Sequence, residues 1–294
     1  MMSRIEEALA KVRRENAQSD SASVRRGVAR SPEAEAVPEP RQHNYGGKRL
    51  DIKFDKLREQ GLLAPDMYER KLAEEYRILK RPLIKNARKT PDALVPRGNI
   101  LLVTSAIAGE GKTFTSVNLS LSISRDRDWS VVLVDADCQK PHLTRLFGAE
   151  REPGLIELLR NPDMSFDSLV MPTNIPGLSL LPAGAQDKHA SELLASSRMG
   201  ALAEHLATAD VQRMVIFDSA PLLLTSETVA LASHVGQVLL VVSACKTSQQ
   251  SVVSARNLLD SDMAISLLLN QVARGGGAEQ YGQYGHYGQD SEPG

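Results

Sequence analysis

The chain has 294 residues, enough for one or two domains at about 150 residues per domain. Its apolar share of 42% excludes a wholly disordered chain, because that share can supply a sizeable hydrophobic core. The 35 Lys and Arg residues nearly balance the 36 Asp and Glu residues, so the net charge of -1 gives no basic field for nucleic acid. Two cysteines exclude a disulfide framework, and no apolar stretch approaches the roughly 18 residues that cross a bilayer. We therefore expect a cytoplasmic, largely globular protein.

The first 48 residues divide into a short helix and a linker. Residues 1–15 predict an amphipathic helix, because Ile5, Leu9 and Val12 fall on one helical face. Residues 16–48 are rich in Ser, Ala, Pro, Arg and Glu and contain no Leu, Ile or Phe. Such a composition cannot bury enough apolar surface to offset the entropy of ordering, which predicts a flexible linker.

Residues 49–98 are expected to form a helical lead-in to the main domain. Asp66 can cap a helix that runs to about Arg81, with apolar residues along one stripe. Proline removes a helical N–H group and clashes with the preceding turn, so Pro82 is expected to kink or end this helix.

Residues 99–272 show an α/β pattern. Five continuous apolar runs have the length of buried strands, with a weaker run at 178–181: they are 100–103, 131–134, 214–217, 238–242 and 265–269. Helical patterns lie between them, at 113–124, 192–206, 226–233 and 248–259. This alternation predicts a mainly parallel sheet with helices on both faces, and ligands bind such sheets beyond the carboxyl ends of the strands.

The first apolar run leads directly into AIAGEGKT, residues 106–113. The stretch matches the phosphate-binding pattern GxxxxGK[ST], with Ala106 in place of the first glycine. Backbone N–H groups of such a loop cradle phosphates, while Lys112 supplies charge to the β- and γ-phosphates and Thr113 a hydroxyl to Mg²⁺. The alternative is a glycine-rich turn that contains GKT by chance. The residues expected to hold a nucleotide here are Ala108, Gly109, Glu110, Gly111, Lys112, Thr113 and Phe114.

Acidic residues follow two of the predicted strands. Asp135 and Asp137 end the second run, and Asp218 ends the fourth, so a parallel sheet would bring all three to the edge that carries the phosphate loop. We expect Thr113, Asp137 and Asp218 to bind Mg²⁺, which prefers oxygen ligands. Lys112, Asp135 and Asp137 form the catalytic group, in which one of the two Asp residues could accept a proton from a hydroxyl nucleophile. The sequence does not separate these two roles, and acids that merely end strands are the alternative.

The last segment, residues 273–294, is a Gly- and Tyr-rich tail of low complexity that we expect to be flexible. Tyr281, Tyr284 and Tyr287 recur every three residues, and each is followed by glycine. Glycine gives a tyrosine the freedom to enter a catalytic site at a sheet edge. The alternative is a sticky tail that is never modified.

Taken together, GEGKT, VVLVDAD followed by Lys140-Pro141, and VIFDSAPLL resemble the bacterial tyrosine kinase (BY-kinase) family over about residues 70 to 290. The N-terminal helix and linker are most similar to the autokinases of exopolysaccharide loci associated with exosortase, the chain-length determinant tyrosine kinases. The resemblance implies a P-loop NTPase fold of the MinD/ParA-like type. It also implies that the tail tyrosines Tyr281, Tyr284 and Tyr287 accept phosphate.

The resemblance gives roles to residues outside the loop. Asn270 matches an adenine-contacting asparagine of related P-loop ATPases, although a chance loop asparagine fits equally well. Glu74, Arg77 and Lys80 match the oligomerisation motif ExxRxxR, with Lys80 replacing the last arginine. Gln139 also departs from the family, standing where many relatives have arginine.

The resemblance further implies ATP and Mg²⁺ as cofactors and an autokinase that regulates exopolysaccharide synthesis, export and chain length. The implied partners are a membrane-anchored chain-length regulator that activates the kinase, further copies of the chain in a homo-oligomer, and a phosphotyrosine phosphatase, with no nucleic acid. The protein would then be cytoplasmic and peripheral at the inner membrane through its partner. Two alternatives are a MinD/ParA-like switch ATPase with water as acceptor and an assembly scaffold ordered by ATP. The switch ATPases carry an extra loop lysine where this chain has Ile107.

Overall fold

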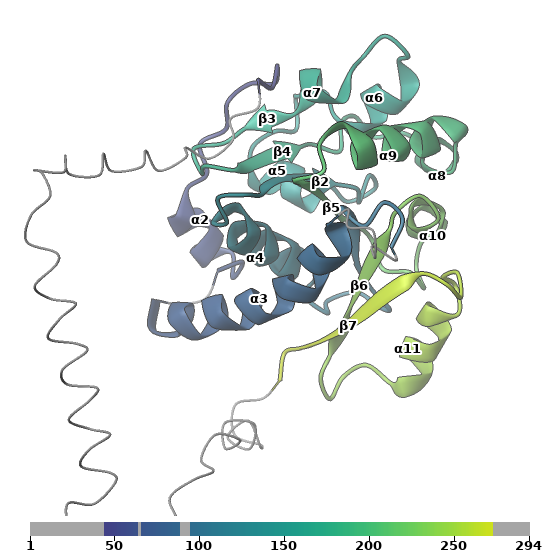
Figure 1. Ribbon diagram of the computed structural model, residues 1–294. Helices are drawn as coiled ribbons and strands as arrows, with labels where there is room; N and C mark the ends of the chain where they lie inside the picture. The colour runs from purple at the N-terminus through teal and green to yellow at the C-terminus, as the bar shows by residue number, and fades with distance from the viewer. Residues whose placement is uncertain (1–43, 64–65, 89–94, 273–294) are drawn as a thin grey trace, which may run out of the picture. The chain divides into compact units, whose positions relative to one another are not determined.

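The computed structural model describes residues 44–63, 66–88 and 95–272. Within these residues, one sheet has the strand order β3-β4-β2-β5-β1-β6-β7, and every strand except β3 runs parallel to its neighbours (Figure 1). The strands are β1 (Ile100–Ser105), β2 (Ser130–Asp135), β3 (Met171–Pro172), β4 (Leu178–Leu181), β5 (Arg213–Asp218), β6 (Gln237–Ser243) and β7 (Ala264–Asn270). This confirms the mainly parallel sheet that the sequence predicts.

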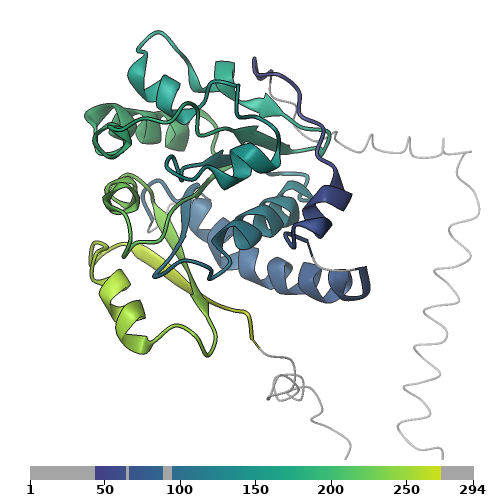
Figure 2. The ribbon, with the colours of Figure 1, turned by 180° about the vertical axis from the view of Figure 1, so that it is seen from behind.

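Helices cover both faces of the sheet, as Figures 1 and 2 show. Along β1, Leu101 and Val103 enter one hydrophobic core and Ile100 and Leu102 the other, because successive side chains of a strand point to opposite faces. The first core lies under α2 (Phe54–Glu59), α3 (Asp66–Ala87), α4 (Lys112–Ser124) and α5 (His142–Leu146). The second lies under α6 (Leu155–Arg160), α7 (Phe166–Leu169), α8 (Ala190–Leu194), α9 (Ser197–Ala209), α10 (Ser226–Ala232) and α11 (Gln249–Arg256).

Helix α3 differs from its prediction at the C-terminal end. It continues through Pro82 to Ala87, so the expectation that Pro82 could end the helix is wrong. Proline removes one backbone hydrogen bond, the one to the carbonyl of Ile78, and that residue lies on the exposed side of the helix. Burial of Leu83 and Ile84 in the core holds the last turn in helical form despite this loss.

Two other boundaries also differ. The helix expected over 192–206 is two helices, α8 and α9, and Ser196 begins the second by accepting a hydrogen bond from the N–H of Met199. The linker expected over 16–48 ends earlier, because Gly46 and Gly47 donate backbone hydrogen bonds to carbonyls in and beside α7. Residues 1–43 and the tail 273–294, with its tyrosines, lie outside the described residues.

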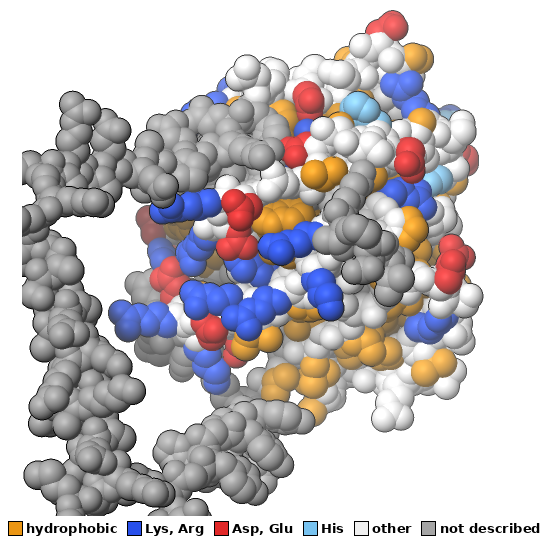
Figure 3. Space-filling model, in the orientation of Figure 1, with side chains coloured by type: hydrophobic (Ala, Val, Ile, Leu, Met, Phe, Trp, Pro, Cys, Tyr) orange, Lys and Arg blue, Asp and Glu red, His pale blue; other side chains and the backbone are white. Residues whose placement is uncertain are grey.

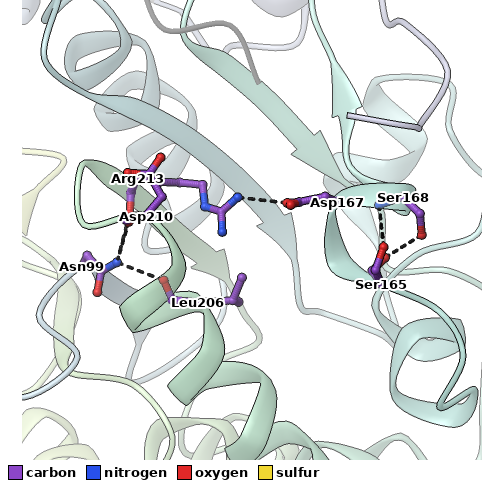
Figure 4. A network of polar contacts seen from close by, with 7 residues as sticks. All are labelled: Asn99, Ser165, Asp167, Ser168, Leu206, Asp210 and Arg213. Carbon is purple, nitrogen blue, oxygen red and sulfur yellow. Dashed lines mark hydrogen bonds and ion pairs between the residues drawn. The ribbon is translucent and has the colours of Figure 1, made fainter. Parts of the chain in front are cut away.

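The amino end of the sheet is fixed by a polar network that Figure 4 shows. Asn99, just before β1, donates hydrogen bonds to the carbonyls of Leu206 and Arg213, both at 3.2 Å. The guanidinium of Arg213 donates to Asp167 at 3.0 Å and lies 5.4 Å from the centre of the Phe166 ring. These contacts tie β1 and β5 to α7 and α9, so the two central strands are held from the end opposite the predicted phosphate loop.

No helix in the described part of the chain combines the length and the apolar character that crossing a membrane requires.

Candidate functional site

The phosphate-binding loop lies between β1 and α4, the strand-to-helix context that the sequence pattern requires. Gly109 and Gly111 have φ angles of 81° and 92°, a left-handed conformation that residues with a Cβ rarely adopt. A Cβ on Gly111 would also lie 2.1 Å from the side-chain nitrogen of Asn270. Gly111 precedes α4 without a side-chain cap, which leaves the first N–H groups of the helix free to face an anion.

The three predicted acids converge on this loop. Asp135 and Asp218 are direct partners in the register of β2 and β5, at the carboxyl ends of both strands. Asp218 receives a hydrogen bond on each oxygen, from the Thr113 hydroxyl at 2.8 Å and the Ser116 hydroxyl at 2.9 Å. The loop, its helix and the acidic strand ends therefore form one site. Ser116 was not predicted, although its position one helical turn after Thr113 places it on the same face.

Burial disfavours the charged forms of the ionisable side chains in this cluster. It raises the pKa of Asp135 to about 7 and that of Asp218 to about 6. It also raises the pKa of Asp137 and lowers that of Lys112, although the nearby acids Asp218, Asp137 and Glu110 oppose the fall for Lys112. A bound cation would stabilise the ionised carboxylates that burial disfavours, and the donor set of hydroxyl and carboxylate oxygens fits Mg²⁺.

The two neighbouring acids have different surroundings. Asp135 is fully buried, and one of its oxygens accepts hydrogen bonds from the backbone N–H and the hydroxyl of Thr144, both at 2.8 Å. Asp137 is half-buried and accepts a hydrogen bond from the backbone N–H of Lys140 at 3.0 Å. Thr144 could not be predicted from the sequence, because it lies on the separate short helix α5. Asp137 is thus the more accessible carboxylate of the pair.

Among the described residues, no group of three or more His, Cys, Asp or Glu side chains could hold a metal ion. Mg²⁺ usually binds proteins through one or two carboxylates and is completed by phosphate oxygens and water. The Thr113 hydroxyl and the Asp218 carboxylate are oxygen donors of this kind.

Two predicted nucleotide-binding residues use their side chains within the protein. The ring of Phe114, in the first turn of α4, packs against Tyr76 of α3, with ring centres 6.5 Å apart. Only the backbone of Phe114 is therefore left to face a nucleotide. The side-chain amide of Asn270 donates to the carbonyl of Glu110 at 2.8 Å. Asn270 therefore lies at the loop, and its contact with adenine stays a prediction.

The predicted oligomer motif lies on α3. Glu74 and Arg77 are exposed and pair with each other at 2.9 Å. Lys80 is 8% exposed and donates to the carbonyl of Ser122 at 2.8 Å and to Asp126 at 2.7 Å. Its ammonium is thus engaged inside the chain, joining α3 to the end of α4, and the exposed part of the motif is reduced to Glu74 and Arg77.

The chain is similar to several known proteins. The family model described as an AAA domain matches residues 98–261. Tyrosine-protein kinase YwqD of Bacillus subtilis is 31% identical over 188 residues, which are 64% of this chain and 77% of YwqD. The kinase domain of the Escherichia coli tyrosine kinase ETK has 26% sequence identity and a TM-score of 0.60, covering 74% of this chain and 80% of that one.

Other relatives are much longer. Tyrosine-protein kinase wzc of Salmonella typhi is 29% identical over 194 residues, which are 65% of this chain but only 26% of wzc. The chain thus spans about a quarter of the length of this relative. From its loop, its acidic strand ends and these relatives, the chain belongs to the bacterial tyrosine kinase family of AAA-type P-loop domains.

Proposed function

We propose that this protein is an ATP-dependent protein-tyrosine autokinase that phosphorylates Tyr281, Tyr284 and Tyr287 of its own tail. The observation that carries the proposal is the convergence of Lys112, Thr113 and three carboxylates at one edge of the sheet. Relatives named as tyrosine-protein kinases support it, among them one of which this chain covers 77%.

Each group has a part in binding. The N–H groups of the loop and the start of α4 would face the phosphates, and Lys112 would neutralise charge on the β- and γ-phosphates. Thr113 and Asp218 would hold Mg²⁺, together with Asp137. When bound, the ion neutralises charge on the phosphate oxygens.

The transfer step needs a proton acceptor. The tyrosine oxygen forms a bond to the γ-phosphorus, the bond from that phosphorus to the bridging oxygen of ADP breaks, and the phenolic proton passes to a carboxylate. Asp135 and Asp137 are the candidates. Asp137 is half-buried, whereas Asp135 is fully buried and hydrogen-bonded to Thr144, and whichever of the two does not bind Mg²⁺ would accept the proton.

Mass spectrometry after incubation with Mg²⁺ and ATP tests the proposal. We expect phosphotyrosine within residues 281–287, and none in the Lys112→Met variant. A matched control is Lys56→Met, which removes an exposed lysine on α2 and should leave phosphorylation unchanged. Release of free phosphate without phosphotyrosine would instead indicate a switch ATPase with water as acceptor. Absence of both products would indicate a scaffold.

The biological setting is part of the same proposal. We infer that the kinase regulates exopolysaccharide synthesis, export and chain length, acts as a homo-oligomer, and is activated by a membrane-anchored chain-length regulator and reversed by a phosphatase. It would lie at the inner membrane through that regulator. Cell fractionation tests this location: the protein should move to the membrane fraction when the regulator is co-expressed, and recovery only in the soluble fraction would contradict it.

A further inference from the structure

Glu110, in the middle of the phosphate-binding loop, has its side chain turned into the protein. It is 1% exposed. One carboxylate oxygen accepts a hydrogen bond from the N–H of Ile107 at 2.7 Å, and the other accepts from the N–H of Ser243 at 3.0 Å and from the hydroxyl of Thr247. All three partners are donors. An acceptor-only carboxylate satisfies them, whereas a side-chain amide would turn an N–H group towards at least one of them.

These contacts join the loop to the neighbouring strand. Ile107 belongs to the loop itself, whereas Ser243 ends β6 and Thr247 lies in the turn before α11. A buried charge that accepts several hydrogen bonds has strong directional interactions, because the low surrounding polarity strengthens each of them. Glu110 thus fixes the middle of the loop against the end of β6.

The end of β7 also holds the loop. Asn270 donates to the carbonyl of Glu110 and Gln271 donates to the carbonyl of Gly109, both at 2.8 Å. Gln271 also accepts a hydrogen bond from the hydroxyl of Ser243 at 2.7 Å, which joins the two strand ends. With both carbonyls engaged in this way, the loop has little freedom to turn its peptide groups over.

We propose that Glu110 is a positioning residue for nucleotide binding: through Ile107, Ser243 and Thr247 it holds the loop with its N–H groups towards the phosphates. The inference rests on the proposed nucleotide site. A loop that is already in its binding conformation pays little ordering entropy when the phosphates arrive. Glu110 therefore acts on nucleotide affinity without touching the nucleotide through its carboxylate.

The test is calorimetric binding of Mg²⁺ with ATP to the full chain, in wild type and in Glu110→Gln. We expect affinity to fall by about tenfold, since charge-assisted hydrogen bonds to the loop are lost. Hydrogen exchange should speed up at the amides of Ile107 and Ser243. Glu204→Gln makes the same chemical change at an exposed position on α9 and should bind like wild type.

A second pair of variants keeps the test decisive if Glu110→Gln does not fold. Thr247→Val removes the hydroxyl that donates to Glu110, and Thr247→Ser retains it. We expect weaker nucleotide binding in the first and near-normal binding in the second, with similar melting temperatures for both nucleotide-free proteins. A purely structural role would lower the melting temperature and leave affinity unchanged.

The outcomes separate this inference from the proposed function. Wild-type affinity in Glu110→Gln, or equal affinity in Thr247→Val and Thr247→Ser, overturns the positioning role while leaving the kinase proposal intact. Absence of nucleotide binding by the wild type itself contradicts the proposed function instead.

Discussion

At the residue scale, the buried acids of the site oppose the folding of the protein when no cation is bound. Asp135 and Asp218 have pKa values raised by burial from 3.8 to about 7 and about 6. A folded-state pKa above the unfolded value means that the folded protein binds more protons. The extra bound protons stabilise the folded protein. This stabilisation is fully present below the unfolded-state pKa of 3.8 and is lost as the pH rises through the folded-state pKa values.

We therefore predict that, without Mg²⁺ and nucleotide, the free energy of unfolding of the wild type decreases relative to that of Asp218→Asn between about pH 4 and pH 6. The variant lacks one of the two titrating groups, so its own decrease should be shallower. Urea denaturation at several pH values measures both proteins. Parallel curves for the two would contradict the assignment of a raised pKa to Asp218.

Lys80 shows how a motif residue can have a role that its pattern does not reveal. Its ammonium joins α3 to the end of α4, and removing it leaves the carbonyl of Ser122 and the carboxylate of Asp126 without this donor. We predict that Lys80→Met lowers the free energy of unfolding by about 1–3 kcal/mol. The exposed neighbour Lys85→Met should change it by less than about 0.5 kcal/mol. Chemical denaturation of both variants decides the point, and equal effects would count against a structural role for Lys80.

The site could be predicted from the sequence only in part, and Asp218, Thr144 and Glu110 show why. Asp218 could be predicted because it ends an apolar run, and parallel strands bring such ends to one edge. The roles of Thr144 and of the inward side chain of Glu110 could not be predicted, because their partners come from elements that only the folded chain brings together. Local patterns carry no information about such contacts.

At the scale of elements, the long apolar runs predicted the central strands correctly. The two-residue strand β3 and the short helices α5, α6 and α7 were not predicted, since so few residues show no periodicity. Helix α3 continues through Pro82 because burial of the following residues, Leu83 and Ile84, outweighs the helix-breaking effect of proline.

Replacing that proline should stabilise the protein. Pro82→Ala restores an N–H donor for the carbonyl of Ile78, so we predict that the free energy of unfolding rises by about 1–2 kcal/mol after allowing for the more flexible unfolded chain. Thermal and urea denaturation measure the change, and Ala73→Pro in the same helix should have the opposite sign. A decrease in the stability of Pro82→Ala would show that the proline is favourable where it lies.

At the scale of the whole molecule, two different surfaces face solvent. Lys and Arg side chains gather over α3, as Figure 3 shows, and exposed apolar side chains, including Leu267, Leu269 and Val253, lie on β7 and α11. The sequence predicted assembly through α3 but gave no sign of the apolar surface, because exposure at an edge strand depends on which elements lack a neighbour.

Phosphorylation of the tail should loosen assembly. Each phosphotyrosine adds about -1.5 to -2 charges, so three phosphotyrosines add up to roughly -6 to the tail. Identical charged tails that meet in an oligomer repel one another. We predict that a fully phosphorylated sample sediments as smaller particles than an unphosphorylated one, more clearly at low salt. The variant with Tyr281, Tyr284 and Tyr287 replaced by Phe should keep its size after incubation with ATP. Equal sedimentation of phosphorylated and unphosphorylated samples would refute the repulsion.

The central claim is that one nucleotide site exists at the carboxyl edge of the sheet, where Lys112 faces Asp137 and Asp218. Calorimetric titration with Mg²⁺ and ATP tests it most directly. We expect saturable uptake by the wild type and by Lys56→Met, and an affinity that is lower by at least about tenfold in Lys112→Met. No uptake by the wild type, or equal uptake by Lys112→Met, would contradict it.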